Sequence, residues 1–157
     1  MRRIPAFKLR AAAWALACLF ASSGADAFTF ADGKPGSCVD EGKTVEEVDA
    51  DPSQASGFTG KAVRTASGFV IFWNQARLKT LAPEVHDYVF FHECAHALVP
   101  TVDEVLANCA GLQAMRAADR AGPAIEAKLA AFYGAGSDYW ARTLKCADAA
   151  PVLPSRR

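Results

Sequence analysis

The sequence predicts an α+β fold, in which an N-terminal β-hairpin or small sheet packs on a buried helix followed by three further helices. Two observations predict it. Residues 61–73 contain two short runs of strand-forming side chains around a turn, and residues 83–149 contain repeated helix start and stop signals. The chain has 157 residues, of which 52% are hydrophobic and 22% charged, so it is suited to one packed domain rather than to disorder.

The hairpin is predicted from residues 61–64 and 69–73, with Ala66-Ser67-Gly68 as the turn. The run from Phe69 to Trp73 is apolar throughout, so we expect its strand to be covered on both faces. The acidic stretch from Asp40 to Asp51 predicts a solvated loop or a short edge strand.

Proline and capping residues define the predicted helices. Pro83 fits the first turn of a helix that runs to about Val99, where Pro100 stops it. This helix is apolar nearly all round, so we expect it in the middle of the domain. Three more helices are expected after Thr101 to about residue 121, over about 124–133, and from a Ser137 cap to about residue 149.

The first 27 residues have the organisation of a secretory signal peptide. Four basic residues precede an apolar run over residues 11–21, and Ala25-Asp26-Ala27 gives an A-x-A cleavage site. The run is too short to span a bilayer, so we expect no membrane attachment after cleavage. The sequence therefore predicts a signal peptide over 1–27, a single domain over 28–150 and a flexible tail over 151–157, in a periplasmic or secreted protein.

The charge balance argues against one class of partner. The whole chain has a formal net charge of zero, and the predicted cleavage removes four basic residues and one acidic residue, which leaves −3. A nucleic-acid partner requires a broad basic surface, so we expect none. No feature of the sequence predicts an oligomeric state.

His92-Glu93-Cys94-Ala95-His96 is the segment that indicates chemistry. Residues four apart share a helix face, so His92 and His96 can reach one metal ion. Glu93 lies about 100° further round the helix, where its carboxylate can take a proton from water beside the metal. Two histidines in so apolar a helix need partners, because burying polar groups costs free energy. We therefore predict a Zn²⁺ site rather than two core histidines.

A catalytic zinc site needs a third protein ligand. His86 lies about 600° before His92 along the helix and points elsewhere, and no histidine follows His96. Glu104 is the best candidate, because it opens the helix that follows the helix of His96; Asp103 is a lesser one. The alternative for Glu104 is a capping box with Thr101, in which its carboxylate folds back onto the helix start.

Four cysteines follow the predicted cleavage site, and in an exported chain an even number predicts two disulfides. Their number leaves three pairings open, and the lack of C-x-x-C spacing argues against a second metal site. Helix geometry places Cys94 and Cys109 behind the metal, on helices that must pack together. We therefore expect Cys94–Cys109 and, by elimination, Cys38–Cys146.

His92-Glu93-x-x-His96 followed by Glu104-Val105-Leu106-Ala107-Asn108-Cys109 resembles the H-E-x-x-H…E-x-x-A-D pattern of gluzincin metallopeptidases. It is most similar to small exported bacterial relatives in which the segment reads H-E-C-x-H…E-A-D-C. The resemblance covers about residues 68–115. It implies a minimal zincin-like domain, zinc ligands at His92, His96 and Glu104, and a general base at Glu93.

The chain departs from this family at Asn108, where an aspartate is usual. The resemblance implies that residue 108 accepts a hydrogen bond from a ligating histidine. An amide oxygen accepts such a bond without a charge, which predicts weaker zinc binding or lower activity. The gap between His96 and Glu104 is also short and leaves no inserted subdomain to wall the cleft.

The sequence is compatible with three functions. The first is a zinc-dependent metallopeptidase acting on a peptide or protein, which the edge of the Phe69–Trp73 strand would hold by strand addition. The second is a zincin-like module that binds zinc with little or no turnover, and the third is a structural or inhibitory protein with a coincidental motif. The sequence does not rank the candidates for a group that stabilises an oxyanion, which are Tyr88, Tyr133, Tyr139 and Arg142.

Overall fold

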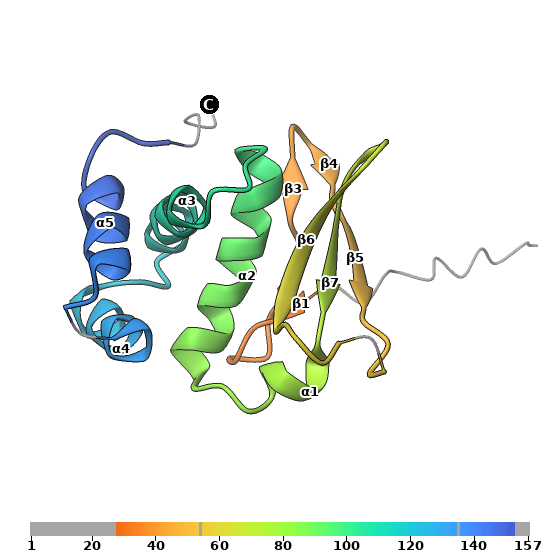
Figure 1. Cartoon of the computed structure of the whole chain (residues 1–157), viewed down its shortest axis with the longest axis horizontal. Coiled ribbons are helices and arrows are strands. Elements are labelled where there is room, and N and C mark those ends of the chain that lie inside the picture. Colours follow the sequence, from red (N-terminus) through yellow and green to blue (C-terminus); the bar gives the residue numbers. More distant parts are fainter. Residues whose placement is uncertain (1–27, 54, 135, 153–157) are drawn as a thin grey trace, which may run out of the picture.

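The computed structural model describes residues 28–53, 55–134 and 136–152, and in them it contains seven short strands and five helices (Figure 1). The strands are β1 (Phe28–Thr29), β2 (Pro35–Gly36), β3 (Val39–Asp40), β4 (Lys43–Thr44), β5 (Glu46–Asp49), β6 (Gly60–Thr65) and β7 (Gly68–Trp73). The helices are α1 (Gln75–Leu78), α2 (Pro83–Leu98), α3 (Glu104–Ala117), α4 (Pro123–Tyr133) and α5 (Asp138–Ala147). The α+β class is confirmed, while the predicted signal peptide and residues 153–157 of the predicted tail lie outside the described residues.

The main sheet has three strands in the order β5-β7-β6. β6 and β7 form the predicted hairpin, with Ala62 opposite Ile71. β5 runs parallel to β7 along its other edge, within the acidic stretch for which the sequence predicts a loop or an edge strand. Glu47 of β5 is buried, and both of its carboxylate oxygens have donors. The backbone N–H of Cys38 and the indole N–H of Trp73 donate to them at 2.8 and 2.9 Å.

Two expectations about the Phe69–Trp73 strand, now β7, are wrong. Ile71 and Trp73 are fully buried against α2, but Val70 and Phe72 on the other face are only partly buried, so the strand is covered on one face rather than on both. β7 is also the central strand, and its two neighbours already occupy its backbone hydrogen-bonding groups. No peptide can add to its edge, and the free edge on the side of α2 belongs to β6.

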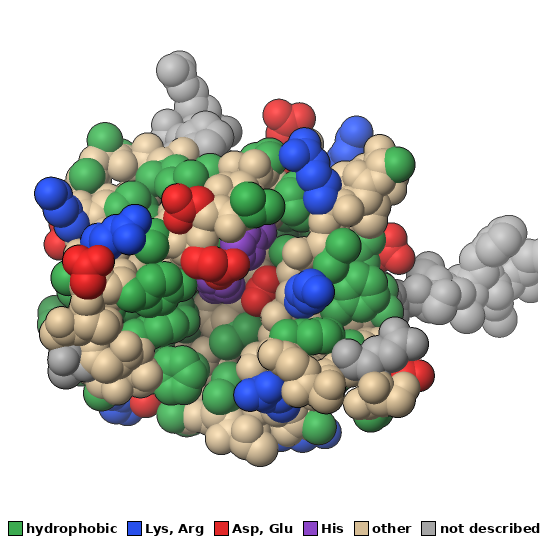
Figure 2. Space-filling view, viewed as in Figure 1, with side chains coloured by type: hydrophobic (Ala, Val, Ile, Leu, Met, Phe, Trp, Pro, Cys, Tyr) green, Lys and Arg blue, Asp and Glu red, His purple; other side chains and the backbone are tan. Residues whose placement is uncertain are grey.

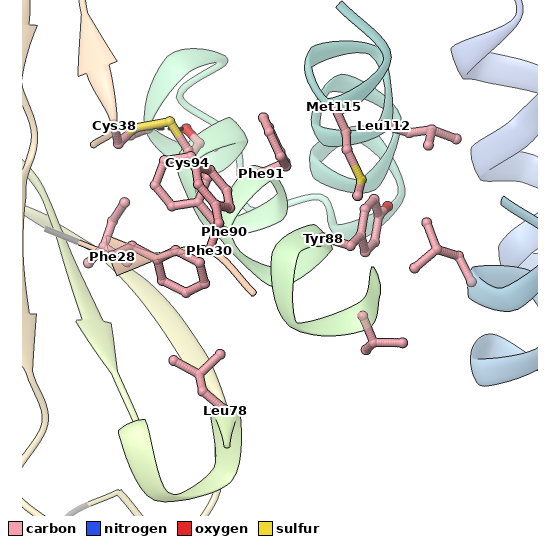
Figure 3. Packing of buried hydrophobic residues seen from close by; sticks show 14 of the residues in the cluster. Phe28, Phe30, Cys38, Leu78, Tyr88, Phe90, Phe91, Cys94, Leu112 and Met115 are labelled. Atoms are coloured by element: carbon pink, nitrogen blue, oxygen red, sulfur yellow. Dashed lines mark hydrogen bonds between the residues drawn. A yellow bond between two sulfur atoms is a disulfide. The ribbon is translucent and has the colours of Figure 1, made fainter. Parts of the chain in front are cut away.

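The predicted central helix is confirmed as α2, which lies between the sheet and the other long helices (Figure 1). Pro83 occupies its first turn as predicted, and the helix ends at Leu98, before Pro100. Aromatic side chains of α2 pack against rings from β1 and β7 on one side and from α4 and α5 on the other. Figure 3 shows this core, in which Phe28, Phe30 and Phe90 lie on the sheet side and Tyr88, Leu112 and Met115 on the helical side.

The three following helices agree with the prediction except at their ends. α3 begins at Glu104 rather than directly after Thr101, because the side chain of Asp103 caps it. It ends near residue 118, because Asp119 adopts a left-handed backbone with φ of 54°. α5 begins after Ser137, whose hydroxyl accepts the Trp140 N–H as predicted. None of the described helices is both long and apolar enough to span a membrane.

Two disulfides are present, but the predicted pairing is wrong. Cys38 bonds Cys94, and Cys109 bonds Cys146. Cys94 does face away from the histidines, but it faces the N-terminal strands, where Figure 3 shows its bond to Cys38. Cys109 points from α3 toward α5. The helical angles correctly excluded both residues from the metal side, but they did not fix on which side of the α2–α3 interface each residue lies.

Candidate metal centre

His92, His96 and Glu104 meet where the last turns of α2 face the first turn of α3. The Nε2 atoms of the two histidines lie 3.3 Å apart. Oε2 of Glu104 lies 3.2 Å from Nε2 of His92 and 3.6 Å from Nε2 of His96. The two histidine side chains are largely buried, whereas Glu104 is exposed and closes the group from the solvent side. The three residues predicted from the sequence are thus brought together.

This triangle fits a tetrahedral zinc ion. Zinc lies about 2.0–2.1 Å from histidine nitrogen and carboxylate oxygen, so two of its ligand atoms are separated by about 3.3–3.4 Å. The three measured separations of 3.3, 3.2 and 3.6 Å lie close to that value. Three protein donors also leave the fourth tetrahedral position for water or substrate, as catalytic sites require. The group could therefore hold a metal ion.

A backbone carbonyl group next to His96 fixes the tautomer of its imidazole ring. Its Nδ1 lies 2.8 Å from the carbonyl oxygen of Thr101, which can only accept, so Nδ1 carries the proton and donates it. Nε2 is then left with a lone pair directed at the other two groups. The turn between α2 and α3 thus fixes the tautomer that ligation needs.

His92 lacks such support. Its Nδ1 is buried and, among the described residues, no group accepts a hydrogen bond from it. Burial alone would lower the pKa of His92, but the Glu104 carboxylate and the charge of Glu93 outweigh burial and raise this pKa. A buried nitrogen without an acceptor costs free energy when it must carry the proton, which it does when Nε2 binds a metal.

Asn108 is fully buried beside this nitrogen but is engaged elsewhere. Its carboxamide nitrogen lies 2.6 Å from the Tyr139 hydroxyl, and its carboxamide oxygen accepts the Tyr88 hydroxyl at 3.0 Å. The hydrogen bond that the resemblance implies is absent within normal distance and angle limits, although the nearby Asn108 side chain contributes to raising the pKa of His92. Asn108 instead joins α3 to Tyr88 of α2 and Tyr139 of α5.

Glu93 lies beside the three ligand candidates and is not one of them. It is buried between α2 and β6, where its Oε2 accepts the backbone N–H of Ala62 at 2.8 Å. Burial raises the pKa of Glu93, and the nearby histidines lower it by a smaller amount. A carboxylate with a raised pKa, fixed next to a metal site, suits a general base.

Gly60 makes room for this carboxylate. A Cβ at this position would lie 2.6 Å from Cγ of Glu93 and 2.8 Å from the Trp73 ring. No side chain larger than hydrogen therefore fits opposite Glu93. The sequence analysis did not identify Gly60 and Ala62 as site residues. The available signal was a glycine directly before a predicted strand, because such a glycine often marks a close approach of another group.

The alternative role for Glu104 is filled by its neighbour. Asp103 caps α3, because its Oδ1 accepts the N–H groups of Val105 and Leu106 at 2.8 and 3.1 Å. Glu104 does not fold back toward Thr101 but faces the histidines. The hydrogen bond with His92, with the charges of both histidines, lowers the pKa of Glu104. Asp103 is accordingly a capping residue rather than a ligand candidate.

The other polar residues named from the sequence differ in their distance from the metal group. Tyr133 and Tyr139 line a hollow next to His92, whereas Tyr88 is fully buried behind it. Burial raises the pKa of Tyr139, and the Glu104 charge adds to this shift. Arg142 is exposed and lies 4.0 Å from Asp138. His86 pairs with Asp87 at 3.0 Å and packs against Phe28 in a tilted arrangement, away from the metal group as expected.

Two hollows flank the histidines. Figure 2 shows the purple histidine surface at the margin of a hollow, partly behind red carboxylate side chains. One, of about 310 Å³, is lined by Tyr133, Tyr139, the exposed Phe132 and the loop at residues 57–60. The other, of about 300 Å³, lies along the free edge of β6 and is bordered by the exposed Val102. The site therefore opens into an extended groove rather than a closed pocket.

No protein-family model, curated protein or solved structure matches this chain.

Proposed function

We propose that this chain is an exported zinc-dependent metallopeptidase that hydrolyses peptide bonds. The observation that carries the proposal is the separation of roles at the site. The donor atoms of His92, His96 and Glu104 are separated by distances that suit a tetrahedral zinc ion. Glu93 is not part of this group, because its carboxylate accepts the Ala62 N–H. Metal binding alone would not require a fourth, buried carboxylate, because burying an extra charge is costly.

The proposed mechanism assigns a task to each group. A bound zinc ion supplies Lewis acidity, which lowers the pKa of water and polarises a carbonyl group. Glu93 accepts the proton of the attacking water and then passes it to the leaving amine. Tyr139 is the proposed donor for the developing oxyanion, since it lines the same hollow as His92 and Glu104. Its hydroxyl oxygen accepts a hydrogen bond from Asn108, which leaves the hydroxyl proton free to donate.

The free edge of β6 suits an extended peptide. Ala62 directs its N–H away from β7, where Glu93 accepts it, so the outward backbone groups left for a substrate are those of Gly60 and Arg64 and the carbonyl group of Ala62. A substrate strand paired with this edge would lie across the metal group. This replaces the edge of β7, which the sequence suggested.

The two disulfides support export. Cys38, Cys94 and Cys109 are buried and Cys146 is partly buried, and disulfides persist in oxidising compartments such as the periplasm or the extracellular medium. A periplasmic or secreted location also agrees with the signal peptide expected over residues 1–27.

One observation favours a second function. Because Nδ1 of His92 has no acceptor, the metal would be held less firmly than in a site where each histidine has a hydrogen-bonded partner. A zinc-binding module with little or no turnover is therefore the alternative.

Turnover by the zinc-loaded protein separates the two functions. We would screen peptide, protein and cell-wall substrates with the wild type and with Glu93→Gln. The peptidase proposal predicts hydrolysis by the wild type and a loss of at least about 100-fold in Glu93→Gln, the usual contribution of a positioned general base. Absence of hydrolysis by the zinc-loaded wild type across the whole screen would contradict it and favour the binding module.

A further inference from the structure

The cations of this protein are unevenly distributed. The described residues contain eleven lysines and arginines against sixteen aspartates and glutamates, which gives a net charge of −5. Ion pairs engage five of these cations. Six described cations form no ion pair, and three of the six line the hollows that flank the metal group; the six are Lys43, Lys61, Arg64, Arg77, Lys79 and Lys145.

These three cations lie on both sides of the site. Lys61 and Arg64 extend from β6 along the hollow at its free edge. Arg77 projects from α1 into the other hollow. Aromatic rings support two of them, because the Arg64 guanidinium lies 5.9 Å from the Phe69 ring centre and the Lys61 ammonium 6.0 Å from that of Phe58. Figure 2 shows blue side chains on the sheet side of the hollow.

The metal group does not use these charges. Glu93 and Glu104 together carry −2, which would balance one divalent cation with neutral histidines. The carboxylate of Glu93 already accepts the Ala62 N–H, and Glu104 already faces the histidines. The groove therefore presents positive charge that no acidic side chain of the described residues balances, on a protein that is otherwise acidic. Such a surface is complementary to a negatively charged ligand.

We propose that the occupant is an acidic polypeptide segment, with Asp or Glu side chains on both sides of the peptide bond that lies at the metal group. Arg77 pairs with carboxylates on one side, and Lys61 and Arg64 pair with carboxylates on the other. The chemistry at the peptide bond rests on the proposed peptidase function, but the charge preference of the groove does not. Segments rich in lysine or arginine are repelled.

The test compares three peptides of equal length that share an apolar centre and differ in their flanks: Glu-rich, Gln-rich and Lys-rich. Cleavage is measured with the zinc-loaded wild type, and binding by fluorescence anisotropy with zinc-loaded Glu93→Gln. We expect kcat/KM for the Glu-rich peptide to exceed that for the Gln-rich one by about tenfold at low salt, and Lys-rich to be the poorest. The ratio should shrink in 0.5 M NaCl, where the charges are screened.

Matched variants assign the effect to the groove. Replacing Lys61, Arg64 and Arg77 together by Gln should reduce the Glu-rich to Gln-rich ratio to near one. Replacing Lys43 and Lys145, which form no ion pair and line neither hollow, should leave the ratio unchanged. Equal cleavage of the three peptides by wild type would overturn the acidic preference and leave the peptidase function standing. Selective binding of the Glu-rich peptide without cleavage would support the acidic preference and contradict the peptidase function. Absence of both binding and cleavage would contradict both proposals.

Discussion

Glu93 is a buried carboxylate, and its burial favours the protonated form more than water does. It lies between α2 and β6 with one backbone N–H as its donor, and burial raises its pKa. The folded protein therefore binds the proton of Glu93 more tightly than the unfolded chain does. Stability falls as the pH rises from the unfolded pKa through the raised folded pKa, and this cost is fully present above the folded value.

Glu93→Gln should therefore stabilise the metal-free protein at neutral pH. Gln keeps an oxygen that can accept the Ala62 N–H and removes the buried charge. We expect a higher Tm than wild type at pH 7, measured by differential scanning calorimetry in the presence of a chelator. The difference should narrow as the pH is lowered toward 4, because Glu93 then becomes neutral. A Tm below wild type at pH 7 would refute this account of Glu93.

Glu104 and Asp103 are adjacent acids with different roles, so they make a matched pair. Glu104→Ala should weaken zinc binding sharply and change the stability of the metal-free protein little, because Glu104 is exposed and does not cap α3. Asp103→Ala should lower the free energy of unfolding by about 1 kcal/mol and preserve zinc stoichiometry. Chemical denaturation and metal analysis of both variants test this, and exchanged phenotypes would restore the capping-box role of Glu104.

Among the elements, the contact between α2 and α3 determines where Glu104 lies. Gly111 allows this contact, because a Cβ there would lie 2.9 Å from the carbonyl oxygen of Phe91 and 3.0 Å from the backbone nitrogen of His92. Both atoms belong to helical backbone and cannot yield without moving a helix. The close approach of α3 at its glycine brings its first turn to the histidines of α2.

Gly111→Ala should therefore disturb the metal site from a distance. We expect a loss of about 1–3 kcal/mol in the free energy of unfolding from overpacking, and weaker zinc binding because α3 carries Glu104 away. Gly122→Ala is the control for zinc binding, since no atom lies within 4 Å of a Cβ at that position. Wild-type zinc affinity in Gly111→Ala, measured by competition with a chromogenic chelator, would show that the helix contact does not position Glu104.

Local patterns predicted the elements better than the contacts between them. The hairpin, α2 and the N-cap of α5 depend on side chains within a few residues, so the sequence indicated them. The i, i+4 spacing also indicated the two histidines. The parallel pairing of β5 and the position of β7 at the centre of the sheet depend on distant segments. For the same reason the Ala62 N–H that holds Glu93, and the loss of Asn108 to two tyrosines, were not predictable.

Across the whole molecule, the two disulfides fasten the outer parts of the chain to the two helices of the site. Cys38–Cys94 joins the N-terminal strands to α2, and Cys109–Cys146 joins α5 to α3. Neither bond links α2 directly to α3. The bonds therefore hold the outer parts of the chain against the two helices and contribute no ligand to the metal group.

Replacing Cys109 and Cys146 together by Ala should lower the free energy of unfolding by about 2–4 kcal/mol. The zinc content at room temperature should remain near that of wild type, because α2, α3 and their ligands keep their own contacts. Urea denaturation and metal analysis measure the two effects. A non-reducing peptide map that links Cys94 to Cys109 in the wild type would contradict the arrangement described here.

The central claim is that His92, His96 and Glu104 form one zinc site with Glu93 beside it. It is tested most directly by measuring zinc per chain in purified wild type, His92→Ala and Glu93→Gln by inductively coupled plasma mass spectrometry. The account predicts about one zinc in wild type and in Glu93→Gln, and none in His92→Ala. Zinc absent from the wild type after incubation with the metal, or retained stoichiometrically by His92→Ala, would contradict it.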